Sequence, residues 1–62
     1  MAFPRAILVR VIARNLRLGQ PPGDVLIVLT ARMPRLTGPE RLALVDDAIA
    51  RNMARHARAL AK

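Results

Sequence analysis

Apolar residues in this chain fall into three segments, separated by two breaks that contain proline and glycine. The first segment predicts a helix over residues 4–18, since proline suits a first helical turn and Gly19 suits the end of a helix. Arg10, Arg14 and Arg17 line one face of that helix, and apolar side chains cover most of the rest. The alternative is a strand within residues 6–13, which are rich in β-branched side chains.

The second segment predicts a helix over residues 22–33, bounded by the Pro21–Gly23 break and by Pro34. Asp24 would lie in its first turn, near the positive end of the helix dipole. Residues 25–29 are apolar on every side, so we expect this element to be buried whether it is helix or strand. A lone buried strand would need partner strands that the rest of the chain hardly supplies.

The third segment predicts the longest helix, over residues 38–61. Thr37 followed by Glu40 has the pattern of a capping box, in which each residue satisfies a backbone N–H of the other. The expected apolar face consists of Leu42, Val45, Ile49, Met53, His56 and Leu60. The expected opposite face consists of Glu40, Asp47, Arg51, Arg55, Arg58 and Lys62.

The lengths of these helices predict an overhang. At about 1.5 Å per residue the third helix is ~36 Å long and the other two are ~20 Å each, so they cannot cover all of it. We therefore predict an all-α domain of three helices spanning residues 1–62, which self-associates through the third helix. The expected interface residues, for a second copy or another partner, are Ile49, Met53, His56 and Leu60.

Composition supports a need for a partner and limits the chemistry. The chain has 62 residues, no cysteine and one histidine, so neither a disulfide nor a zinc site can supplement its small core. Serine, tyrosine and tryptophan are also absent, which leaves Thr30 and Thr37 as the remaining hydroxyl nucleophiles. No glycine-rich phosphate loop occurs. We expect a protein that is not an enzyme and uses no cofactor or metal.

The net charge of +7 points to a polyanion or an acidic surface as partner. Ten arginines against one lysine is also what a GC-rich genome produces, so the placement of the arginines matters more than their number. They form two stripes, and we predict contact with a nucleic-acid backbone or an acidic protein through Arg10, Arg14, Arg17, Arg51, Arg55, Arg58 and Lys62. Binding by base stacking is disfavoured because Phe3 is the only aromatic residue.

Two DNA-binding folds remain alternatives at this point. A helix-turn-helix would pair residues 22–33 with the helix from 38, although its recognition helix would begin with Pro39 and Glu40, a poor match. A ribbon-helix-helix dimer would use residues 7–12 as its strand.

The alternative function is a protein-interaction module that docks the apolar face of the long helix on a partner. A regulatory role would fit either function. No membrane span is expected, because the longest apolar run, residues 25–31, is far shorter than the ~20 residues a span needs. We expect a mature, cytoplasmic protein, since arginines interrupt the apolar run near the start as no secretory signal would.

Overall fold

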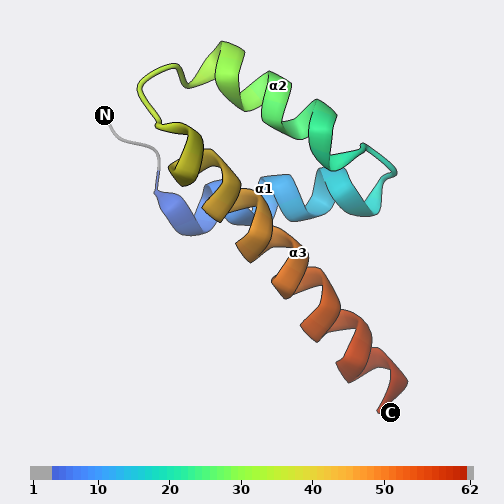
Figure 1. Ribbon diagram of the computed structural model, residues 1–62. Helices are drawn as coiled ribbons and strands as arrows, with labels where there is room; N and C mark the ends of the chain where they lie inside the picture. Colours follow the sequence, from blue (N-terminus) through green and yellow to red (C-terminus); the bar gives the residue numbers. More distant parts are fainter. Residues whose placement is uncertain (1–3, 62) are drawn as a thin grey trace.

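The computed structural model describes residues 4–61, which form three α-helices and no strand. They are α1 (Arg5–Arg17), α2 (Pro22–Arg32) and α3 (Gly38–Leu60). The predicted three-helix architecture is confirmed, with boundaries within one residue of those expected. Residues 7–12 and 25–30 are helical, so the strand alternatives are wrong and the ribbon-helix-helix arrangement is excluded. Figure 1 shows α1 and α2 packed around the first half of α3, whose second half extends beyond both.

The turn that follows α1 explains why this helix ends at Arg17. Gly19 has a φ of 101°, a left-handed conformation that glycine adopts without steric cost. Its N–H donates to the Leu16 carbonyl at 3.1 Å, and the Gln20 N–H donates to the Asn15 carbonyl at 3.1 Å. These two bonds are those of a Schellman motif, which satisfies carbonyls left free at a helix end.

The second helix is less buried than the sequence suggested. Pro22 occupies its first turn and Asp24 lies there too, as predicted. Val25 and Leu29 are buried, four residues apart on the face toward the core. Ile27, however, is 68% exposed, and Val28 is exposed as well. The expectation that residues 25–29 are buried is therefore wrong for part of the segment, because the neighbouring helices cover only one face of α2.

The capping box at the start of α3 is present as predicted. The Thr37 backbone N–H donates to Glu40 Oε1 at 2.8 Å, and the Glu40 N–H donates to Thr37 Oγ1 at 3.2 Å. These bonds satisfy two donors that have no partner within the helix. They also hold the pKa of Glu40 below its ordinary value of 4.5, chiefly through the bond from the Thr37 backbone.

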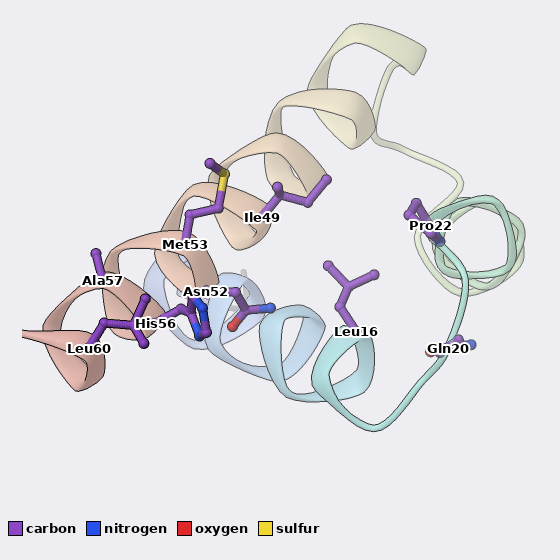
Figure 2. A pocket seen from close by; sticks show the side chains of 9 residues that line it. All are labelled: Leu16, Gln20, Pro22, Ile49, Asn52, Met53, His56, Ala57 and Leu60. Carbon is purple, nitrogen blue, oxygen red and sulfur yellow. The ribbon is translucent and has the colours of Figure 1, made fainter.

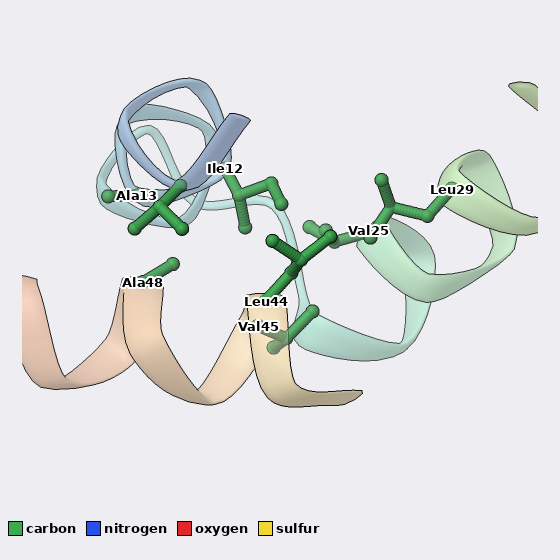
Figure 3. Close-up of a cluster of buried hydrophobic side chains, with 8 residues drawn as sticks. Ile12, Ala13, Val25, Leu29, Leu44, Val45 and Ala48 are labelled. Carbon is green, nitrogen blue, oxygen red and sulfur yellow. The ribbon is translucent and has the colours of Figure 1, made fainter. Parts of the chain in front are cut away.

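The core is small and aliphatic, and α3 is its base (Figure 3). Ala13 of α1 and Ala48 of α3 are both fully buried, and such small side chains let two helix backbones approach closely where they cross. The buried residues are Val9, Ile12 and Ala13 of α1, Val25 and Leu29 of α2, and Leu44, Val45 and Ala48 of α3.

The buried face of α3 differs from the predicted apolar face. Leu44 and Ala48 pack inward with Val45, whereas Leu42 is 51% exposed. The predicted stripe and the buried face lie next to each other around the helix and share only Val45. The error arises because alanine carries little hydrophobic weight in a sequence pattern, although it is what a close helix crossing requires.

The second half of α3, from Met53 on, is not covered by α1 or α2, and we call it the bare half. Every described residue after Asn52 is exposed, and the molecule measures 41 × 23 × 17 Å along its principal axes. The predicted overhang, which includes Met53, His56 and Leu60, is therefore present within a single chain. Its cause is the difference in length between the 23 residues of α3 and the 13 and 11 residues of its two neighbours.

Candidate functional site

Five of the predicted arginines line one groove between α1 and α3, with a volume of about 440 Å³. We call it the arginine groove. Arg10, Arg14 and Arg17 come from α1, and Arg51 and Arg55 come from α3. Ile7 and Val11, both exposed, complete its lining. The two stripes that the sequence shows separately thus form a single concave basic surface.

The helix crossing explains why the stripes meet. Residues three and four apart lie on one face of a helix, so each stripe follows one side of its helix. The crossing at Ala13 and Ala48 brings α1 and α3 close together, with their arginine faces on the same side of the contact. A sequence pattern shows the stripe on each helix, but only the crossing geometry shows that they face one space.

Asn52 fixes one arginine at this crossing. Its Nδ2 donates to the Ala13 carbonyl at 3.0 Å, and its Oδ1 accepts from Arg17 Nη1 at 2.9 Å. The asparagine is half-buried and joins α3 to α1 from inside the contact. The sequence analysis missed it, since a single asparagine among arginines and alanines gives no signal.

The other groove arginines keep their donors available. Within residues 4–61, the arginines that donate side-chain hydrogen bonds are Arg5, Arg17 and Arg41. All five groove arginines are exposed to solvent. Their guanidinium groups therefore present N–H donors that a ligand can take from water.

Among the residues that the structure describes, no acidic side chain lines the arginine groove. Within the described chain one ion pair forms, between Arg5 of α1 and Asp47 of α3. Asp47 therefore pairs across helices, and Asp46 is exposed.

Two predicted site residues are not among those that line the groove, for different reasons. Arg58 is exposed on the bare end of α3 and does not line it, and Lys62 lies outside the described residues. The start of α3 is also unsuited to reading bases as a helix-turn-helix would, because the Glu40 carboxylate is held in the capping box.

A second groove, which we call the apolar groove, lies along the bare half of α3 (Figure 2). Ile49 of α3 lies across it from Leu16 of α1 and Pro22 of α2, and Met53 lines it further along α3. Its volume is about 560 Å³, and among residues 4–61 no charged side chain of arginine, aspartate or glutamate lines it. The described residues that line it are Leu16, Gln20, Pro22, Ile49, Asn52, Met53, His56, Ala57 and Leu60.

All four predicted interface residues therefore lie together in this groove. Met53 and Leu60 are 67% and 73% exposed, which is high for large apolar side chains. His56 was predicted as one of these interface residues. In the single chain it is exposed and makes no side-chain hydrogen bond to residues 4–61.

Residues 4–61 offer few other kinds of site. No group of three or more histidine, aspartate or glutamate side chains in this range could hold a metal ion. None of the three described helices combines the length and apolar character needed to cross a membrane.

Comparisons with protein-family models, with curated proteins and with solved structures find no match to this chain.

Proposed function

We propose that this protein binds nucleic acid through the phosphate backbone, which lies in the arginine groove. The observation that carries the proposal is the convergence of five arginines from two helices on one concave surface without an acidic residue. If the excess of arginine reflected only a GC-rich genome, the arginines would be scattered over the exposed surface. It would not by itself gather half of the ten arginines around one groove.

The chemistry of the groove suits phosphate. A guanidinium group donates parallel N–H bonds that match two phosphate oxygens, and such charge-assisted bonds are stronger than neutral ones. Ile7 and Val11 between the arginines provide apolar contact for sugar carbons. Because the sequence has a single aromatic residue, backbone attachment is favoured over base stacking.

The salt dependence of binding follows from the number of arginines. If each of the five neutralises one phosphate, the slope of log affinity against log salt approaches about −4.5 on duplex DNA and about −3.5 on a single strand. Sequence preference should be weak, since backbone contacts carry no base information.

A charge-matched pair of variants tests the proposal. Arg10→Gln/Arg14→Gln removes two charges from the groove, whereas Arg32→Gln/Arg35→Gln removes two exposed charges outside it. Fluorescence anisotropy with labelled duplex and single-stranded oligonucleotides should show binding weakened at least tenfold by the first variant. The second variant should have a clearly smaller effect. Equal losses would show that net charge alone attracts nucleic acid, and absence of binding by the unaltered protein at low salt would refute the function.

A second candidate function, docking on a partner protein, is favoured by the apolar groove. An open apolar surface of this size on so small a chain is typical of an interaction site. An acidic protein could also occupy the arginine groove. Such a partner would still be recovered in a pull-down after nuclease treatment, because its binding does not depend on nucleic acid. In either case we propose a non-enzymatic, cytoplasmic binding protein.

A further inference from the structure

We infer that the apolar groove is the interface of a two-fold symmetric dimer, in which the bare halves of two α3 helices pair antiparallel. The stripe that forms this interface is Ile49, Met53, His56 and Leu60. This inference does not depend on nucleic-acid binding, because its residues and those of the arginine groove are different.

The exposed area of the single chain matches what a dimer would bury. The chain exposes 4896 Å², whereas a folded monomer of 6.8 kDa is expected to expose about 3,950 Å². The excess of roughly 900 Å² is close to the ~800 Å² that each partner contributes to a stable interface. Ile49, Met53 and Leu60 of the apolar groove contribute to that excess, as do exposed apolar side chains elsewhere, such as those of Leu18 and Ile27.

The spacing of the stripe makes it complementary to itself. Its members are separated by four, three and four residues, the spacing of a coiled-coil seam. A two-fold axis between Met53 and His56 therefore places Met53 opposite His56 of the second copy. The same axis places Ile49 opposite Leu60 of the second copy, so every member of the stripe gains a partner from one operation.

The walls of the groove favour the antiparallel orientation. Leu16 and Pro22 stand beside the Ile49 end, and α1 and α2 leave the Leu60 end open (Figure 2). Antiparallel pairing brings the open end of one α3 against the walled end of the other, so Leu60 of each copy is covered by Leu16 and Pro22 of the other. Parallel pairing would place open end against open end and leave these walls uncovered.

The charges also permit a second copy to approach. At 3.6 residues per turn, Arg51, Arg55 and Arg58 lie on the far side of α3 from the stripe. No guanidinium group is therefore desolvated in the seam. The two chains still repel at long range, with +7 on each, and this repulsion weakens as salt screens it. The dimer should tighten with added salt, opposite to nucleic-acid binding.

Sedimentation equilibrium at micromolar concentration provides the first test. The unaltered protein should be dimeric at moderate salt. Met53→Asp and Leu60→Asp should each weaken the dimer at least 100-fold, since each removes an apolar side chain from the seam and desolvates a carboxylate there in both copies. Both positions are mostly exposed in the single chain, so helix content measured by circular dichroism should be retained. Ile27→Asp, at an equally exposed position on α2, should leave the dimer unchanged.

Disulfide cross-linking tests the orientation, which is possible because the chain has no cysteine of its own. In an Ile49→Cys/Leu60→Cys variant the two sulfurs of one chain are ~16 Å apart along α3, too far to join. Oxidation should link position 49 of one copy to position 60 of the other. Trypsin then yields residues 42–51 joined to residues 59–62, which mass spectrometry identifies.

Three outcomes would overturn the inference. The first is a monomer at all concentrations, which would leave the groove for a different protein. The second is a dimer that Met53→Asp and Leu60→Asp do not weaken. The third is linkage of position 49 to position 49, which indicates parallel pairing. Oligonucleotide affinity of the Met53→Asp monomer separates this inference from the proposed function, because the arginine groove remains complete in that variant.

Discussion

Both halves of α3 are helical and contain alanine and arginine, but their surroundings are very different. The first half begins in a capping box and buries Leu44, Val45 and Ala48 against α1 and α2. The second half, from Met53 on, is exposed on all sides and yet remains a regular helix. The first half is held by tertiary packing, and the second half continues it by local hydrogen bonds and good helix-forming residues.

This difference indicates that the two halves of α3 have different roles, one in the core and one at the surface. The first half, with α1 and α2, forms the core. The second half extends both grooves beyond that core, since Arg55 lines the arginine groove and Met53, His56 and Leu60 line the apolar groove. Both grooves begin where α1 crosses α3, since the arginine groove and the apolar groove flank that crossing. Changes in the first half should therefore affect stability, and changes in the second half should affect binding.

The largest expected effect comes from making the same change in each half. Leu44→Ala empties a buried site and should lower the free energy of unfolding by about 2–5 kcal/mol, enough to unfold much of so small a protein. Leu60→Ala, at a position 73% exposed, should change it by less than about 0.5 kcal/mol in the monomer. Urea denaturation in the dimer-disrupting Met53→Asp background provides the measurement. Similar losses for both variants would contradict this difference in roles.

The cap at Thr37 should give the next largest effect. Thr37→Ala removes the bond to the Glu40 N–H and should cost about 1 kcal/mol. Thr37→Ser and Thr37→Asp should largely restore the melting temperature. Thr30→Ala is the matched control, because the Thr30 hydroxyl bonds only to the Leu26 carbonyl within α2.

Oligonucleotide affinity measured well below melting should be the same for all of these threonine variants. If Thr37→Ala abolished binding and left the melting temperature unchanged, Thr37 would be a contact residue rather than a cap.

The smallest effect concerns pH. Because bonds from Thr37 lower the pKa of Glu40 in the folded chain, the charged carboxylate contributes stability above its unfolded pKa, near 4.5. That contribution is lost as pH falls through the lower folded pKa. The melting temperature should therefore fall slightly more steeply below pH 4.5 in the unaltered protein than in Glu40→Gln. Parallel curves for the two proteins would mean that the capping box does not depend on the carboxylate charge.

Much of the fold could be predicted because its signals are local. Pro22, Gly19 and the Thr37–Glu40 pair mark helix ends through backbone chemistry that involves only neighbouring residues. The overhang followed from helix lengths alone. The burial of α2 was predicted wrongly, because an apolar run such as residues 25–29 does not show how many faces its neighbours cover.

The sites were predictable only in part, for a related reason. Periodicity identified the arginine stripes on α1 and α3, and also the stripe from Ile49 to Leu60. It could not show that the arginine stripes meet, because that depends on the angle and closeness of a crossing set by Ala13 and Ala48. The role of Asn52 depends on the same crossing, since it bonds to residues 35 and 39 positions away.

We propose that the arginine groove, and not the total charge of the protein, binds phosphate. Arg55 and Arg58 lie three residues apart on the bare half of α3, but only Arg55 lines the arginine groove. The most direct test is the salt dependence of duplex affinity for the unaltered protein, Arg55→Gln and Arg58→Gln. Arg55→Gln should reduce the log–log slope by about 0.9, the value for one lost phosphate contact, and Arg58→Gln should leave it unchanged. Equal reductions by the two variants would contradict the account.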